Sequence, residues 1–105
     1  MSTDAFNFSK PNAVRMLKAL ANEHRLSILC RLRDGEVSVT ELSQQLPLSQ
    51  SALSQHLAWL RAEQLVQYRR EGQSVFYRLS DARTIQVLHL LNQLYEQEGN
   101  AGDPV

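Results

Sequence analysis

Apolar side chains recur at helical spacing through the first third of the chain. They repeat every three or four positions from Pro11, which suits the first turn of a helix, to about Ala21. A second helix is predicted after Asn22, because its side chain can accept a hydrogen bond from the first turn. Asp34 and Gly35 are predicted to end it, since glycine readily adopts the left-handed conformation found after helices.

The pattern then predicts two further helices joined by a short linker. Ser38 and Glu41 have the spacing of a capping box, which starts a short helix that Pro47 ends. Ser49 can cap the next helix. Two helices joined by residues 46–49 have the proportions of a helix-turn-helix.

The stretch LSQSALSQHLAWL, residues 48–60, has one apolar face and one polar face. On a helical wheel Leu53, Leu57 and Leu60 fall in a narrow arc that suits a protein core. The opposite arc carries short donors and acceptors, one methyl group and one guanidinium, but no acid: Gln50, Ser51, Ser54, Gln55, Ala58 and Arg61. Glutamine can pair with adenine and serine can donate or accept at a base edge, so this face suits a DNA groove. The alternative is an ordinary solvated face.

A two-stranded hairpin is predicted directly after this helix. Residues 65–70 and 74–79 have strand-like composition, and residues 71–73, which include glycine, suit the turn between them. A helix-turn-helix followed by a hairpin is a winged helix. The predicted fold is therefore a winged helix-turn-helix, mainly α with a small β-hairpin, in the order α-α-α-α-β-β-α.

The last helix is predicted to begin after Ser80 or Asp81, either of which can cap it, and to run to about Glu98. A chain of 105 residues is expected to form one domain. That domain is expected at residues 9–98, with a flexible arm at 1–8 and a disordered tail at 99–105.

Composition indicates a soluble, cytoplasmic, globular protein. Apolar residues make up 43% of the chain and charged residues 21%, and the single cysteine excludes an intrachain disulfide. Neither a secretory signal nor an apolar run approaching the ~20 residues of a membrane span is visible. The net charge is zero, yet residues 1–35 carry six basic and three acidic side chains, whereas residues 84–105 carry three acids and no base. The acidic end can thus lie away from a basic face.

Three segments resemble the ArsR/SmtB family of dimeric winged-helix repressors over about residues 11–97. They are LKALANEHRLSIL (17–29), VTELSQQLPLSQSALSQHLAWLR (39–61) and LVQYRREGQSVFYRLS (65–80), and the second is similar to the branch with an SQSALSQHL-type recognition helix. The resemblance implies that residues 48–62 enter the major groove and that the hairpin tip touches the backbone or the minor groove. Gln64 stands where relatives usually have glycine, so it would adopt a left-handed conformation at a cost of roughly 1 kcal/mol.

Two metal sites found in relatives are expected to be absent. Where one site needs two cysteines, this chain reads Ser38-Val39-Thr40, and hydroxyls cannot replace thiolates as soft-metal ligands. At the other site the aligned residues are Asp81, Arg83, Leu94 and Gln97, which leaves one carboxylate of four ligands. No metal and no other cofactor is predicted.

Cys30 matches the first of two cysteines in thiol-based sensors of the same branch. The segment Leu94-Tyr95-Glu96 lacks the second, so a bridge within one protomer is excluded. Cys30 is therefore either oxidised alone, if its thiolate is accessible, or an inert small apolar residue, which is the interpretation we favour.

The three histidines carry no recognisable catalytic pattern. His24 and His89 lie on polar helix faces, and His56 borders the leucine stripe, where it can pack, cap or reach a phosphate; we favour packing. Neither a nucleophile–histidine spacing nor a glycine-rich phosphate loop is present, so no enzymatic activity is predicted.

The last helix has a wider apolar surface than the core of one small domain requires. Its apolar residues span about 160° of the helical wheel, whereas a core-facing stripe needs only about 100°. The excess suggests a subunit contact, and the family resemblance implies that the first and last helices form it. The expected dimer residues are Val14, Leu17, Val87, Leu88, Leu91, Leu94 and Tyr95. Alternatively, Phe6 and Phe8 fold back over this surface.

A two-fold dimer would place two recognition helices about 34–36 Å apart, which matches successive major grooves of an imperfect palindrome. The expected DNA-binding residues are Ser49, Gln50, Ser51, Ser54, Gln55, His56, Arg61, Arg69, Arg70 and Gln73. The serines and glutamines of the helix would read bases, and Ser49 or Gln50 could hold a phosphate at the helix N-terminus. The arginines, including Arg78, would neutralise phosphates. Arg69 and Arg70 alternate along a strand, so only one of them is expected to meet DNA.

The predicted function is a homodimeric transcriptional repressor that binds a palindromic operator in double-stranded DNA. An activator that displaces another repressor would use the same contacts. A winged-helix interaction module without DNA binding is the third interpretation, motivated by the neutral net charge.

Overall fold

Four helices with side-chain caps on three of them make up the first two thirds of the molecule. The computed structural model describes residues 6–101, with side chains through Glu96. The helices are α1 (Lys10–Leu20), α2 (Glu23–Arg31), α3 (Val39–Gln45) and α4 (Gln50–Ala62). Asn22, Ser38 and Ser49 each accept a 3.0 Å hydrogen bond from the backbone N–H three residues later. These three predicted caps are confirmed.

The wing contains one strand more than the sequence predicted. β1 (Val37–Ser38), β2 (Val66–Glu71) and β3 (Ser74–Leu79) form an antiparallel sheet in the order β1-β3-β2. The predicted hairpin is confirmed, but its turn has two residues rather than three, because Glu71 pairs with Ser74. Gly72, in that turn, has a φ of 62°, which glycine adopts without steric cost.

Gln64 adopts the left-handed conformation predicted for it, with a φ of 65°. Its N–H donates to the Arg61 carbonyl at 2.9 Å, and the Leu65 N–H donates to the Leu60 carbonyl at 2.9 Å. These are the two bonds of a Schellman motif, which satisfies carbonyl groups at the end of α4. The chain can therefore leave α4 and enter β2 without a glycine.

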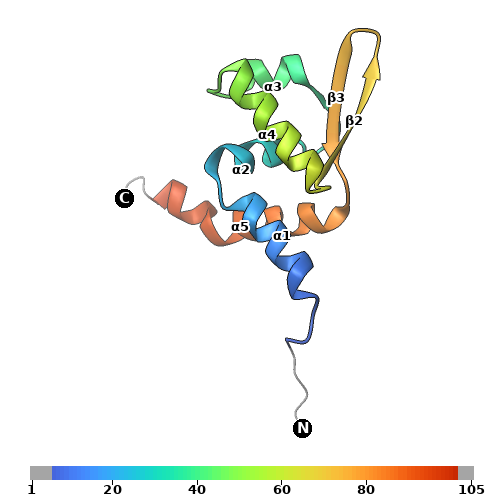
Figure 1. Ribbon diagram of the computed structural model, residues 1–105. Helices are drawn as coiled ribbons and strands as arrows, with labels where there is room; N and C mark the ends of the chain where they lie inside the picture. The colour runs from blue at the N-terminus through green and yellow to red at the C-terminus, as the bar shows by residue number, and fades with distance from the viewer. Residues whose placement is uncertain (1–5, 102–105) are drawn as a thin grey trace.

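The core lies where α2, α3 and α4 pack against one another and the base of the wing. Figure 1 shows the wing rising beside α4, with α1 and α5 (Ala82–Ala101) at the opposite end of the molecule. The core side chains are almost all aliphatic: Ala19, Ile28, Leu29, Leu32, Leu42, Leu46, Leu53, Leu57, Leu60, Leu65, Val66, Tyr77 and Leu88. The helix-turn-helix and the wing are thereby held on one base.

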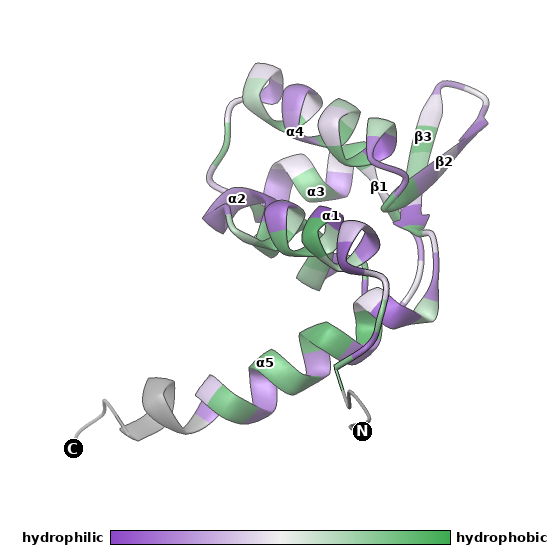
Figure 2. Cartoon of the chain, turned by 60° about the horizontal axis from the view of Figure 1, so that its bottom comes forward, coloured by the Kyte–Doolittle hydropathy of each residue, from purple (hydrophilic) through white to green (hydrophobic). Residues whose placement is uncertain are grey.

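Helix α5 extends beyond its predicted end. It continues through Ala101, three residues past Glu98, while residues 1–5 of the expected arm and 102–105 of the expected tail lie outside the described residues. Figure 2 shows α5 leaving the body of the molecule, with apolar and polar residues alternating along the coloured part of the helix. None of the helices described is long and apolar enough to cross a membrane.

Candidate nucleic-acid interface

Helix α4 separates into the two faces that its sequence predicted. Leu53, Leu57 and Leu60 are buried in the core. The opposite face is solvent-accessible along the whole helix and consists of Gln50, Ser51, Ser54, Gln55, Ala58 and Arg61. It offers hydroxyl and amide groups and one guanidinium, but no carboxylate. Such a surface can hydrogen-bond to base edges without repelling phosphates.

Arg25 in α2 contacts both α1 and α4. The Arg25 guanidinium donates to the carbonyls of Lys18 and Ala19 at 2.9 and 3.2 Å, at the C-terminal end of α1. The same group lies 4.1 Å from the centre of the Trp59 ring in α4. One side chain thus joins α1, α2 and α4, and the interaction is favourable because a cation is attracted to an aromatic face.

Replacing Arg25 with alanine is expected to lower the free energy of unfolding by about 2 kcal/mol, since it removes two charged hydrogen bonds and a cation–π contact. Thermal or urea denaturation followed by circular dichroism measures the change. The matched control is Arg31→Ala, which removes an exposed guanidinium from the same helix. A loss no larger than that of the control would show that Arg25 does not hold these helices together.

His56 lies on the flank of α4, half-buried beside His24. The two ring centres are 5.8 Å apart. Partial burial lowers the pKa of His56, and the nearby charges of Arg25 and His24 lower it further. The lowered pKa favours a neutral imidazole at neutral pH, in keeping with the packing role favoured for this residue.

The two sides of the wing differ in chemistry. Val66, Tyr68 and Arg70 lie on the side of the wing that faces α4. Their cross-strand partners in β3, which share this side, are Leu79, Tyr77 and Val75. Residues Gln67, Arg69 and Glu71 alternate with them and lie on the other side. As expected from alternation, the neighbouring arginines 69 and 70 diverge.

Arg69 is held on the far side of the wing by two carboxylates. Its Nε donates to Glu36 at 2.9 and 3.0 Å, and its Nη1 donates to Glu71 at 3.0 Å. The hydrogen bond from Arg69 holds the pKa of Glu36 below its ordinary value. Arg78, on the same side, lies 3.9 Å from Glu36 and donates to Gln67. These two guanidinium groups are therefore already paired within the protomer.

Arg70 lies on the side of the wing that faces α4, and Arg61 lies on α4 itself. Among the side chains described, residues 6–96, no carboxylate lies within ion-pair distance of either guanidinium. The Arg61 guanidinium instead lies 4.6 Å from the centre of the Tyr68 ring.

Sequence reasoning missed two residues of this region. Glu36 precedes the unpredicted strand β1 and meets Arg69 across 33 residues of sequence, for which the chain carries no local signal. Tyr68 does have a signal, because it alternates with Val66 and Arg70 and must share their side of the wing.

Exposed apolar side chains of α1 and α5 form a second surface away from the wing. Val14, Leu17, Leu90, Leu94 and Tyr95 are all exposed. Val87 and Leu91 are half-buried. Leu88, which the sequence assigned to a subunit contact, is only 5% exposed and belongs to the core of the protomer. Because helix spacing alone cannot divide a broad apolar arc between core and interface, the sequence did not separate Leu88 from its neighbours.

The N-terminal phenylalanines leave this surface uncovered. Phe6 is 74% exposed and Phe8 is 54% exposed, while Leu94 and Tyr95 each remain 57% exposed. Phe8 lines a cleft together with Val87 at the start of α5, but Leu94 and Tyr95 stay exposed, so the two phenylalanines do not cover the whole apolar surface of the last helix, as the alternative considered from sequence requires.

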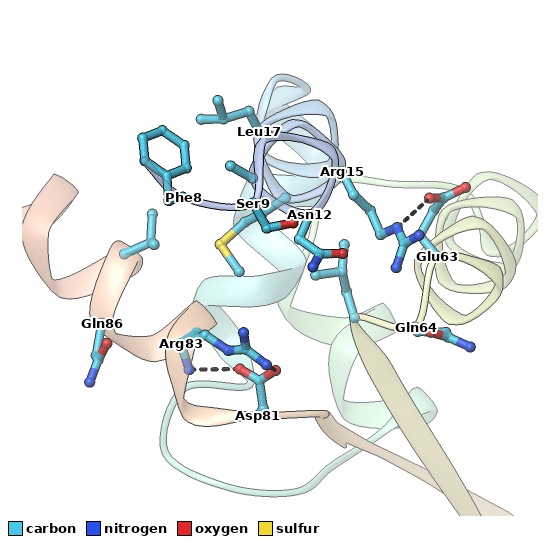
Figure 3. A pocket seen from close by; sticks show the side chains of 14 residues that line it. Phe8, Ser9, Asn12, Arg15, Leu17, Glu63, Gln64, Asp81, Arg83 and Gln86 are labelled. Carbon is cyan, nitrogen blue, oxygen red and sulfur yellow. Dashed lines mark hydrogen bonds and ion pairs between the residues drawn. The ribbon is translucent and has the colours of Figure 1, made fainter. Parts of the chain in front are cut away.

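A cleft of about 600 Å³ lies between α1, the junction of α4 with β2, and the start of α5 (Figure 3). Met16, Leu65 and Val87 are among its apolar lining residues. Two ion pairs flank it, Arg15 with Glu63 at 3.7 Å and Arg83 with Asp81 at 3.3 Å. Within the described part of the chain, no three histidine, cysteine or acidic residues gather closely enough to hold a metal ion.

Cys30 is exposed at the end of α2. Partial burial of its sulfur raises the pKa of the thiol, although the charges of Arg33 and Arg31 act in the opposite direction. A raised pKa leaves less thiolate at neutral pH, and thiolate is the reactive form.

Alkylation of Cys30 in the folded protein is expected to be slower at pH 7–8 than in the denatured chain, and its rate should still rise above the ordinary thiol pKa of about 8.5. Mass spectrometry after timed alkylation at several pH values measures this, with Cys30→Ser as the blank. A rate that reaches its plateau below pH 8 would contradict the raised pKa.

The helix-turn-helix, the wing and the acid-free face of α4 define a winged helix-turn-helix DNA-binding protein. Residues 22–68 match the family described as "Bacterial regulatory protein, arsR family". The transcriptional activator HlyU of Vibrio cholerae serotype O1 is 54% identical over 97 residues, which cover 92% of this chain and 90% of that protein. The chain belongs to the ArsR family of bacterial transcription regulators, as the sequence predicted.

Solved structures agree with this assignment. HlyU from Vibrio cholerae has a TM-score of 0.81 at 55% identity, covering 88% of this chain and all of that one. The transcriptional repressor BigR from Xylella fastidiosa has a TM-score of 0.78 at 38% identity, covering 81% and 87%. A homodimeric winged helix-turn-helix DNA-binding domain from Mycobacterium bovis has a TM-score of 0.73 at 27% identity, covering 89% and 92%. The predicted winged-helix fold is confirmed, and the protein is a DNA-binding transcription regulator.

Proposed function

We propose that the protein is a homodimeric repressor that binds an imperfect palindrome and occludes a promoter. The observation that carries this proposal is the solvent-accessible face of α4, which presents only hydroxyl, amide, methyl and guanidinium groups beside the wing. A face without carboxylates can approach the phosphate backbone closely enough for side chains to reach base edges.

The base-reading residues in this proposal are Ser51, Ser54 and Gln55, with Ser49 and Gln50 at the helix N-terminus. Arg61, Arg70 and the hairpin residue Gln73 would contact the backbone. Arg69 lies outside the proposed contacts because Glu36 and Glu71 already neutralise it. His56 would support α4 from its flank.

The dimer in this proposal forms through α1 and α5. The exposed side chains of Val14, Leu17, Leu94 and Tyr95 support it, because a contiguous apolar surface of this kind marks an interaction site. A homodimeric relative with the same fold supports it further. The half-buried Val87 and Leu91 would lie at its edge.

We also propose that the regulator works without the metal sites found in relatives. Ser38 serves as the N-cap of α3 through its hydroxyl. Asp81 is bonded to the backbone and guanidinium of Arg83. Both positions therefore have structural roles that do not involve a metal.

A second candidate function is activation by displacement of another repressor. It is favoured by one observation, that the relative with 54% identity is named a transcriptional activator. The same DNA contacts would serve in either case. A reporter gene behind the bound promoter distinguishes them, since a repressor lowers transcription without any second protein.

Selection of bound sequences from a random duplex pool tests the proposal. A palindromic motif should emerge, and its affinity should fall steeply between about 50 and 200 mM salt. Arg70→Gln should reduce the slope of log affinity against log salt by about 0.9 for each phosphate that is no longer neutralised, whereas Arg69→Gln should leave it unchanged. Failure to enrich any motif, together with salt-independent binding, would favour an interaction module instead.

A further inference from the structure

A hollow lies between the C-terminal end of α4 and the edge of the wing. It is lined by Arg61, Gln64, Val66, Gln67, Tyr68 and Ser80. The polar side chains that line it on the side of the wing facing α4 are one guanidinium, one amide, one phenol and one hydroxyl, because the Gln67 side chain lies on the other side and accepts a hydrogen bond from Arg78. No carboxylate lines the hollow, so its chemistry suits an anion that accepts several hydrogen bonds.

The guanidinium of Arg61, the one cationic group among the described residues that line this hollow, packs on a pair of stacked tyrosines. The Arg61 guanidinium lies 4.6 Å from the centre of the Tyr68 ring, and the Tyr68 ring stacks on Tyr77 at 5.6 Å. Tyr77 is only 7% exposed, whereas Tyr68 is 42% exposed. Tyr68 is thus fixed from the core side and accessible from the solvent side.

Comparison with Arg69 of the wing shows what is particular about Arg61 of α4. Arg69 lies over Phe76 at the same distance of 4.6 Å, but it also binds two carboxylates. Among the described side chains, Arg61 has the aromatic support without any carboxylate partner. Its charge is therefore available to an external anion.

The position of the hollow indicates which anion this is. On the helical wheel Arg61 falls within about 40° of Gln50 and Ser54, so it continues the exposed ridge of α4 toward the wing. Figure 1 shows the end of α4 meeting the start of β2, so the hollow lies between the two elements proposed to contact DNA. β2 is an edge strand, which also leaves backbone N–H groups open on that side.

We propose that this hollow binds one phosphate of the DNA backbone, with Arg61 supplying the charge and the Tyr68 hydroxyl donating a hydrogen bond. The inference rests on the proposed function and adds a subsite to it. A contact of this kind carries no base information but fixes the register of α4 on the duplex.

The test uses fluorescence anisotropy with the selected operator and with a random duplex. Tyr68→Phe keeps the ring beneath Arg61 and removes the hydroxyl, and it should weaken binding to both duplexes about 3- to 10-fold with little change in salt slope. Arg61→Gln should weaken binding at least about 10-fold and reduce the slope by about 1.8, because a dimer would lose one phosphate contact in each half-site. Tyr77→Phe and Arg69→Gln, the matched controls, should remain within about twofold of wild type. Circular dichroism melting verifies that all four variants fold.

Duplexes that carry a single neutral methylphosphonate locate the phosphate. At one position per half-site, the methylphosphonate should weaken DNA binding by the wild-type protein. It should not further weaken DNA binding by the Arg61→Gln protein. If the wild type binds DNA, and Tyr68→Phe and Arg61→Gln bind it as tightly as the wild type does, the subsite alone would be overturned. So would an altered base preference in Arg61→Gln, since Arg61 would then read a base. A wild type without salt-dependent DNA binding would overturn the proposed function and the subsite together.

Discussion

Replacing Leu94 with glutamate is expected to convert the protein into a monomer and to lower its affinity for a two-half-site operator by about 100-fold or more. Leu94 is 57% exposed and lies among the apolar side chains of α1 and α5. A carboxylate there would have to be buried without a partner when two protomers meet, which is costly. The fall in DNA affinity follows because each protomer would then bind its half-site without help from the other.

Light scattering coupled to size-exclusion chromatography measures the change, since one protomer has a mass of 12.0 kDa. The matched control is His89→Glu, which adds the same charge to the exposed polar side of α5. The protomer should stay folded in both variants, because neither position belongs to the core. A Leu94→Glu protein that remains dimeric at micromolar concentration would place the subunit contact elsewhere.

Replacing Gln55 with alanine is expected to weaken binding to the selected operator by at least about 30-fold and to leave binding to random duplex within about twofold. A bidentate contact between glutamine and adenine contributes about 1–3 kcal/mol of discrimination, and a dimer would forgo it in both half-sites. Gln55 is exposed on α4 and has no role in the core, so stability and dimerisation should be unchanged.

Competition between operator and random duplex in a mobility-shift assay gives the specificity ratio directly. Gln86→Ala removes an exposed glutamine from α5 and serves as the control. Repeating the selection with the Gln55→Ala protein should also yield a motif that is degenerate at one position per half-site. An unchanged motif would remove Gln55 from the residues that read the sequence.

The helices were predictable because the forces that set their ends are local. Asn22, Ser38 and Ser49 cap helices through bonds to residues three positions away, and the side chain of each cap suggests this role. The faces of α4 were equally predictable, since three leucines at helical spacing determine which side is buried. Even the strained Gln64 was foreseen, from its place in the family pattern.

What the sequence could not reveal depends on contacts between distant segments. A strand as short as β1 has no periodicity, and it exists because Val37 and Ser38 pair with β3 some forty residues later. The pairing of Arg69 with Glu36 depends in turn on that strand. For the same reason the sequence left open which of two neighbouring arginines lies on the side of the wing that faces α4, although it predicted that they would diverge.

The bridge made by Arg25 restricts the DNA sites that the protein can accept. Because its guanidinium fastens the end of α1 to Trp59, α4 has little freedom to swivel against the helices proposed to join the subunits. Inserting one base pair between half-sites turns them by about 34° relative to each other. A stiff frame cannot follow that rotation, so the spacer length should be as selective as the bases themselves.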